Sequence, residues 1–460
     1  MTDASPVARP AASGRVRPFA VTHASVLRIA VPMTLAHLST PVVGLVDTAV
    51  IGQLGEAALI GGIAVAAIVF DIVFTTFNFL RGATTGLTAQ AVGAEDASEE
   101  QAVLMRAFGV ALAAGIAVVA LQVPLGAIGF AALGVGGEVA QAALAYFAIR
   151  IWATPFALAN YVVLGWLLGR AEAAIGLALQ VLLNGLNVAL SLHFVLGFDW
   201  GIAGVAVATL LAEAVTAAAG VAIVLARLPR AGRPPVAYVF ELTALKRMLA
   251  VNRDMMIRSF ALLFAFAFFT RQGVQYGEVV LAANAILMHF FMVGSYFLDG
   301  LAAAAEQRAG RAVGARYRPA FVRAVKLTAL WGLLLGLGLS AVYVAVGTTI
   351  VDIMTTAPEV RETARAFLPW AVLTPLAGAI AFQMDGIFIG ATWSRDMRNM
   401  MLLSLVVYLA AWAALTPAWG NDGLWAALLI FLGARSVSFL LRMRRRLPET
   451  FPPEPAAAAT

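Results

Sequence analysis

Apolar runs long enough to cross a lipid bilayer recur along this chain from residue 24 to residue 443, with short polar gaps between them. A membrane-spanning helix needs roughly 20 apolar residues, and twelve such runs can be placed. They lie near 24–52, 57–80, 101–128, 138–163, 169–196, 201–226, 248–272, 278–304, 319–348, 356–384, 397–417 and 423–443. Because 62% of the residues are hydrophobic and only 12% are charged, we predict an all-α integral membrane protein.

Several classes of function are disfavoured by the residues that the chain lacks. No cysteine occurs, which excludes thiolate nucleophiles, iron–sulfur clusters and cysteine-based zinc sites. The four histidines are scattered singly, and no nucleophile with a neighbouring base or phosphate-binding loop is evident. We therefore expect no enzyme, no cofactor and no bound metal. We expect no nucleic-acid partner either, because the basic residues punctuate apolar runs without forming a stripe.

Basic residues predict the orientation in the membrane. With the N-terminus inside, most arginines fall in the even-numbered connections or at the C-terminal end, and the opposite connections hold few. The basic residues on the inner side are Arg170, Arg227, Arg230, Arg233, Lys246, Arg247, Arg308, Arg311, Arg316, Arg318, Arg395, Arg398, Arg442, Arg444, Arg445 and Arg446. We expect a multi-pass protein of the inner (plasma) membrane, with both termini in the cytoplasm.

The two halves of the chain share short sequence repeats. The string AVGA at 91–94 recurs at 312–315, and Gly165 with Gly169 recurs as Gly386 with Gly390 at the same offset. This pattern predicts two pseudo-symmetric six-helix lobes with a substrate cavity at their interface. The expected parts are a cytoplasmic tail 1–23, an N-terminal lobe 24–227, a cytoplasmic linker 228–247, a C-terminal lobe 248–446 and a cytoplasmic tail 447–460.

Asp47 lies in the first predicted span, within PVVGLVDTAVIGQLG. An ionised carboxylate in hydrocarbon is costly, so such a group usually faces a cavity, has a partner or takes up a proton. A proton-coupled exporter needs this chemistry, although a buried acid can also serve only to bind donors on neighbouring helices. Pro32 and Pro41 interrupt the same span, where they either allow the helix to bend during function or form static kinks.

The fifth predicted span carries Gln180, Asn184, Asn187 and Ser191 on one helical face, because successive members are three or four residues apart. Such a polar stripe either lines a cavity or forms hydrogen bonds between helices. Other acids within predicted spans are Asp71, Glu213, Asp299, Glu306 and Asp385.

Segments in both halves carry a family resemblance. They are LVDTAVIGQLG (45–55), NFLRGATTGLTAQAVGA (78–94), WGIAGVAVAT (200–209), DGLAAAAEQRAGRAVGAR (299–316) and AFQMDGIFIGATWSRDMRNMM (381–401). With these segments the chain resembles the multidrug and toxic compound extrusion (MATE) family, and within it the DinF-like branch. The resemblance implies twelve helices in two lobes, a central cleft, and export of amphipathic, often cationic compounds in exchange for protons or sodium.

The resemblance also implies roles for particular residues. Asp47 occupies the position of the first-span acid that is the proposed proton and substrate site of DinF-like members. Pro32 matches the proline of the family's bending first helix. Tyr146, Asn187 and Thr209 are similar to positions of the family's cavity around that acid.

One departure from the family pattern concerns the fifth span. Many related transporters have a second acid where this chain has Ser191, which leaves Asp47 more isolated. We include Ser191 and Asn184 in the expected proton and substrate site. Sodium-coupled relatives place acids in the C-terminal lobe, so Asp299 and Asp385 form a possible secondary ion site.

The expected function is therefore antiport by alternating access, with protons as the coupling ion and amphipathic small molecules as substrates. Sodium coupling is one alternative, and a lipid-linked saccharide flippase of the same superfamily is another. A flippase would need basic residues along its cleft, where only Arg150 and Arg258 are candidates. The lipid bilayer is the expected partner, and we expect the protein to work as a monomer.

Overall fold

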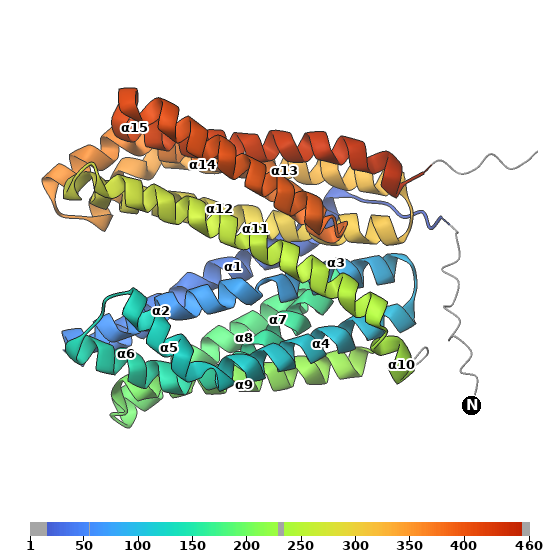
Figure 1. Cartoon of the computed structure of the whole chain (residues 1–460), viewed down its shortest axis with the longest axis horizontal. Helices are drawn as coiled ribbons and strands as arrows, with labels where there is room; N and C mark the ends of the chain where they lie inside the picture. The colour runs from blue at the N-terminus through green and yellow to red at the C-terminus, as the bar shows by residue number, and fades with distance from the viewer. Residues whose placement is uncertain (1–15, 55, 229–233, 453–460) are drawn as a thin grey trace, which may run out of the picture. The chain divides into compact units, whose positions relative to one another are not determined.

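The computed structural model describes residues 16–54, 56–228 and 234–452 of the 460-residue chain. Within these ranges every regular element is a helix, which confirms the predicted all-α fold (Figure 1). Most of both predicted tails, and Arg230 and Arg233 of the predicted linker, lie outside the described residues.

The helices of the first half, in chain order, are α1 (His23–Gly52), α2 (Ala57–Phe77), α3 (Phe79–Gly93), α4 (Ala97–Ala120), α5 (Gln122–Ala132), α6 (Gly137–Arg150), the 3-10 turn η1 (Ile151–Ala153), α7 (Thr154–Gly169), α8 (Ala173–Leu192), the π-helical turn η2 (His193–Gly197) and α9 (Gly201–Arg227). The second half contains α10 (Val236–Val239), α11 (Leu242–Val274), α12 (Glu278–Gly314), α13 (Arg318–Met354), α14 (Pro358–Gly390) and α15 (Ser394–Thr450).

These helices agree with the twelve apolar runs of the sequence. Among the described residues, ten helical stretches are long and apolar enough to cross a membrane, and α2 with α3 and α6 with α7 each count as one stretch. One more run, 248–272, lies on α11, which carries charges in its first half. The two runs 397–417 and 423–443 both lie on α15, which joins two helices across Gly420, whose φ of 55° and ψ of −127° are not helical.

One boundary of the prediction was wrong. The predicted span 101–128 is broken at Leu121, and a separate short helix, α5, begins at Gln122. Pro124 explains the break, because a proline cannot donate the backbone hydrogen bond that would continue α4. At its other end α4 starts at an N-cap, where the Asp96 side chain accepts a hydrogen bond from the Glu99 backbone nitrogen at 2.9 Å.

Internal packing divides the described chain into two compact units, here called the first and second unit. The first unit contains residues 35–249, and the second contains residues 16–34 and 250–452. All of α1 was predicted to belong to the N-terminal lobe, whereas its beginning, up to Thr34, packs in the second unit. Gly300 of α12 explains this packing, because a Cβ atom there would lie 2.6 Å from the backbone nitrogen of Thr34.

The repeated glycines allow close helix packing within each unit. A Cβ atom on Gly165 of α7 would lie 2.6 Å from the Arg81 carbonyl oxygen of α3. In the second unit, a Cβ atom on Gly386 of α14 would lie 2.2 Å from the Ala302 carbonyl oxygen of α12. Small residues let helix backbones approach inside a membrane, so the sequence repeat marks an equivalent helix pair in each unit.

The predicted linker contains the short helix α10, which is fastened to α4. Arg106 of α4 donates to the backbone oxygens of Val239 at 2.8 Å and Tyr238 at 3.0 Å, and it pairs with Glu99 at 2.8 Å. The Tyr238 hydroxyl group donates to Glu99 at 2.8 Å. Burial and this hydrogen bond to a carboxylate both raise the pKa of Tyr238.

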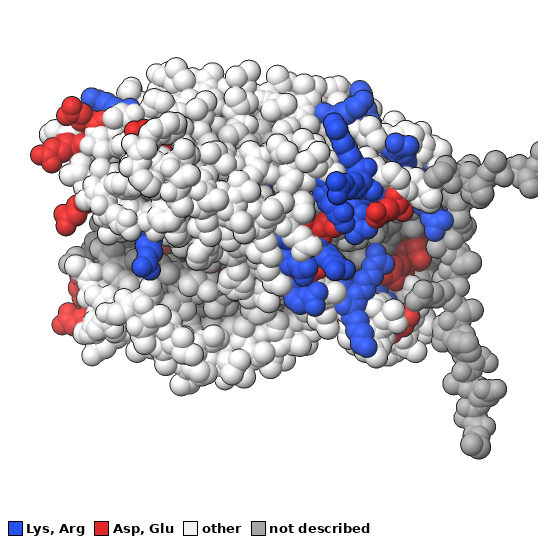
Figure 2. Space-filling view, turned by 45° about the horizontal axis from the view of Figure 1, so that its top comes forward, with Lys and Arg blue, Asp and Glu red and all other residues white. Residues whose placement is uncertain are grey.

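Charged side chains gather at the helix ends of each unit. Figure 2 shows a broad surface along the helices that is almost free of charge, with Lys and Arg concentrated toward one end. Ion pairs at these ends join Arg170 to Glu100 at 2.5 Å in the first unit and Arg398 to Asp254 at 2.7 Å in the second. A long apolar surface with charged ends is expected of helices that cross a bilayer.

Candidate functional site

Asp47 lies near the end of α1 and is 8% exposed. Its Oδ1 atom accepts a hydrogen bond from the hydroxyl group of Ser191 on α8 at 3.0 Å, and Ser191 is fully buried. A hydrogen bond to a carboxylate is stronger than one between neutral groups. The serine that replaces the second acid of the family pattern is therefore a direct partner of the first acid.

Tyr146, Asn187 and Thr209 form a polar group around the same place in the first unit. The Asn187 amide donates to the Thr209 hydroxyl group at 2.9 Å, and Thr209 donates to the Val205 carbonyl oxygen at 3.1 Å. Tyr146 on α6 is 1% exposed. Its hydroxyl group interacts with Thr209 and is close enough to Asp47 for the two groups to interact electrostatically. The structure thus brings these predicted residues together from α1, α6, α8 and α9.

Arg150, one turn after Tyr146 on α6, supplies positive charge to this group. It donates to the Tyr146 hydroxyl group at 2.9 Å, and its guanidinium group lies over the ring of Phe70, 4.6 Å from the ring centre. A guanidinium group over an aromatic face is attracted by the electrons of the ring. From the sequence Arg150 was predicted only as a possible cleft residue, and neither contact was predicted.

Asn184 extends the polar face of α8 away from Asp47. Its amide nitrogen donates to the Ser39 hydroxyl group of α1 at 2.7 Å, and its oxygen accepts from Gln180 at 3.0 Å. Part of this polar face therefore joins helices. The face also leaves the Oδ1 atom of Asn187 buried without a protein partner, and such an atom is expected to bind water or a ligand.

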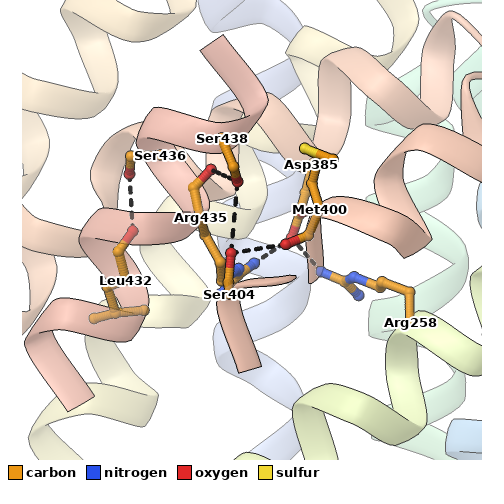
Figure 3. Close-up of polar contacts among 8 residues, drawn as sticks. All are labelled: Arg258, Asp385, Met400, Ser404, Leu432, Arg435, Ser436 and Ser438. Carbon is orange, nitrogen blue, oxygen red and sulfur yellow. Dashed lines mark hydrogen bonds and ion pairs between the residues drawn. The ribbon is translucent and has the colours of Figure 1, made fainter. Parts of the chain in front are cut away.

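In the second unit, Asp385 of α14 is buried between two arginines (Figure 3). Its Oδ2 atom accepts from Arg435 of α15 at 2.6 Å and from Arg258 of α11. The side chain of Arg435 is only 1% exposed, and its guanidinium group also lies over Phe382 and Phe431. The carboxylate is thus neutralised by side chains of its own unit.

Asp299, the other member of the possible secondary ion site, lies on α12 and lines a cavity of about 550 Å³. Arg435 lines the same cavity and lies within electrostatic range of Asp299. The other walls are mostly apolar, with Leu262, Phe266, Phe269, Met288, Phe291 and Met292 among the lining residues. A cavity of this size and character can hold a drug-sized amphipathic molecule.

Sequence reasoning missed a second buried polar group in this unit. Asn284 of α12 and Asn421 of α15 exchange hydrogen bonds of 2.8 and 3.1 Å, and the Trp425 indole nitrogen donates to Asn284 at 2.9 Å. Asn421 follows the break at Gly420, so this group fastens the kink in α15 to α12. The sequence signal that could have predicted this group is Asn284 itself, a polar residue within the apolar run 278–304.

Known proteins are similar to this chain over most of its length. The MatE family model matches residues 32–192 and 255–411. The DNA damage-inducible protein F of Escherichia coli (strain K12) is 35% identical over 422 residues, which cover 91% of each chain. The chloroplastic protein DETOXIFICATION 44 of Arabidopsis thaliana is 26% identical over 438 residues, covering 92% of this chain and 82% of that protein.

Solved structures show the same fold. A multidrug resistance MATE family transporter of the MOP superfamily, in an outward-facing conformation, matches with a TM-score of 0.84 and 18% sequence identity. The match covers 93% of this chain and 96% of that one.

Proposed function

This chain belongs to the MatE family, whose members are efflux transporters and not enzymes, and from that membership we propose that it exports amphipathic, cationic compounds in exchange for protons. The chain is a multi-pass membrane protein. The proposal places it in the inner (plasma) membrane as a monomer in contact with lipid. Both termini lie in the cytoplasm, because basic residues favour that side.

Asp47 carries the proposal, because it is a buried carboxylate with a hydroxyl partner and neighbouring polar side chains. In its charged form it attracts a cationic substrate from the inside. A proton from the outside neutralises it and removes that attraction, so the substrate is released. One charge crossing the membrane field contributes about 2.3 kcal/mol per 100 mV, enough to drive such an exchange in one direction.

Tyr146, Asn184, Asn187, Ser191 and Thr209 surround or extend this site and position the carboxylate and the substrate. Three hydrogen bonds support this role: Ser191 donates to Asp47, Asn187 to Thr209, and Asn184 to Ser39. A donor held in place needs no reorganisation when the charge of Asp47 changes.

Pro32 provides the bend that changes the shape of the site. It lies in α1, where its ring removes one backbone hydrogen bond of the helix. Asp47 lies fifteen residues further along the same helix, or roughly 22 Å at the usual rise per residue. A bend at Pro32 therefore displaces the carboxylate.

Sodium coupling through Asp299 and Asp385 is the alternative, and the contacts of Asp385 weigh against it. Arg258 and Arg435 already hold the carboxylate of Asp385, so a sodium ion would have to displace a guanidinium group or share the oxygens with it. Pairing with Asp385 also offsets part of the positive charge of Arg258 and Arg435, which weighs against a saccharide flippase.

Transport by the purified protein in liposomes tests the proposal. We expect a proton gradient to drive export of the fluorescent cation ethidium, and Asp47→Asn to reduce that export by about a hundredfold. Asp199→Asn, the same chemical change in the exposed turn before α9, is the matched control and leaves export intact. The proposal is overturned if Asp47→Asn exports ethidium at the wild-type rate, or if a sodium gradient alone drives export.

A further inference from the structure

Helices α8 and α9 turn polar faces toward each other in the first unit. The face of α8 comprises Gln180, Asn184, Asn187 and Ser191. On α9 the residues Thr209, Glu213 and Thr216 are spaced by four and three positions, so they also share one face. Glu213 adds a carboxyl group that has no part in the site around Asp47.

One hydrogen bond and one shared cavity fix the register of these antiparallel helices. Asn187 donates to Thr209, and Gln180 lines the same small cavity as Thr216. Gln180 precedes Asn187 by seven residues and Thr216 follows Thr209 by seven, so both observations fit one register. Glu213 therefore lies one turn beyond Thr209, on the side away from Asp47. Along α8, the level of Glu213 is roughly 12 Å from Ser191, the partner of Asp47.

The small cavity beside Glu213 has a volume of about 70 Å³ and is lined by both polar and apolar residues. Asn160 and Tyr161 of α7 contribute to it together with Gln180, Glu213 and Thr216. Its volume exceeds the ~10–15 Å³ that one buried water needs. The Thr216 hydroxyl oxygen is buried without a protein partner, which also indicates water in this cavity.

Glu213 is held by a neutral donor. The Asn160 amide donates to its Oε2 atom at 2.7 Å and to its backbone oxygen at 3.1 Å. Among the described residues no lysine or arginine forms an ion pair with it. Tyr161 of α7 and Arg150 of α6 act on it only through space, and α8 carries no charged residue. A carboxyl group that no arginine locks into its charged form is free to exchange a proton.

The position of Glu213 along the unit gives the exchange a direction. Arg227 at the end of α9 pairs at 3.0 Å with Glu172, which directly precedes α8, so these helix ends lie together at the basic end of the unit. Glu213 lies between Asp47 and that end, which is the cytoplasmic end in the proposed orientation.

We propose that Glu213 is a second proton carrier, which accepts the coupling proton from Asp47 through the polar faces of α8 and α9 and delivers it to the cytoplasmic end of the first unit. In this step the carboxyl group of Asp47 loses its proton and becomes anionic, and the carboxylate of Glu213 becomes neutral. Water in the cavity then takes the proton from Glu213 and restores its charge. This inference rests on the proposed role of Asp47.

Glu213→Gln is the variant that tests the relay. A glutamine oxygen can still accept the hydrogen bond from Asn160, so the variant loses the acid with little change in packing. The matched control is Glu138→Gln at the exposed start of α6. Glu213→Asp restores the acid on a shorter side chain.

Two measurements on liposomes containing the full chain separate a relay from a structural role. The rate of proton release to the cytoplasmic side, read with a pH-sensitive dye during ethidium exchange, falls about a hundredfold in Glu213→Gln and recovers partly in Glu213→Asp. The dissociation constant for ethidium at fixed pH stays at the wild-type value. Infrared difference spectra lose one carboxyl band in Glu213→Gln and a different one in Asp47→Asn.

The outcomes distinguish the relay from the function on which it rests. If Asp47→Asn abolishes proton-driven export while Glu213→Gln releases protons at the wild-type rate, the relay is rejected and the proposed function stands. Wild-type export by Asp47→Asn would reject both. Equal losses of ethidium binding and proton release in Glu213→Gln would assign Glu213 a structural role and likewise reject the relay.

Discussion

Replacing Arg435 by methionine removes a guanidinium group from a buried carboxylate and leaves an unbranched apolar side chain in its place. Asp385, 5% exposed, would lose the 2.6 Å contact to Arg435 and retain Arg258 alone. Removing one partner of a buried ion pair typically costs about 3–5 kcal/mol. Because Arg258 still pairs with the carboxylate, we expect the free energy of unfolding to fall by about 3 kcal/mol.

Thermal unfolding of the detergent-solubilised protein, followed by tryptophan fluorescence, measures this loss. A decrease of that size corresponds to a fall in Tm of roughly 6–12 °C for a unit of this length. Arg365→Met is the matched control, because Arg365 pairs with Asp352 near the end of α13 and the two side chains are 47% and 36% exposed. An ion pair at that exposure contributes about 1 kcal/mol or less.

A double variant isolates the charge from the packing. Asp385→Asn combined with Arg435→Met removes the buried negative charge that the single variant leaves behind. We expect its Tm to lie above the value predicted by adding the two single effects. Two results would refute this reasoning: strict additivity of the two single effects, or an Arg435→Met variant as stable as Arg365→Met. Either would show that the pair of Asp385 and Arg435 is not a stabilising buried contact.

Two further predictions concern packing and topology. Gly300→Ala should lower the free energy of unfolding by about 1–3 kcal/mol because its Cβ atom would collide with Thr34, whereas Gly338→Ala, with no atom within 4 Å, should be neutral or stabilising in the same thermal assay. Since the chain has no cysteine, a single introduced cysteine can be labelled with an impermeant maleimide. We expect Arg318→Cys to be labelled from the cytoplasmic side and Glu138→Cys from the outside. The reverse pattern would contradict the proposed orientation.

The helical spans could be read from the sequence because bilayer thickness fixes their length. A run of about 20 apolar residues has few structures open to it other than a membrane helix. The glycine repeat at 165 and 386 was equally informative, because close helix packing requires small side chains at fixed positions. The polar face of α8 followed from its periodicity alone.

The partners of these polar residues could not be read from the sequence. Asp385 and Arg435 lie on different helices, and nothing local to either residue indicates the other. The division of α1 between the two units depends on the contact of Thr34 with Gly300, which lie even further apart along the chain. The break before α5 could have been predicted from Pro124. The roles of Asp47 and its neighbours in binding protons and substrate stay predictions.

The division of α1 has a mechanical consequence. The helix begins within the second unit and carries Asp47 within the first, and the assignment changes after Thr34, two residues beyond Pro32. Because the backbone of α1 is continuous, any displacement between the two units must bend, twist or stretch this helix. The strain is expected to concentrate where proline has removed a hydrogen bond. Helix α1 would then couple the charge of Asp47 to movement of the second unit.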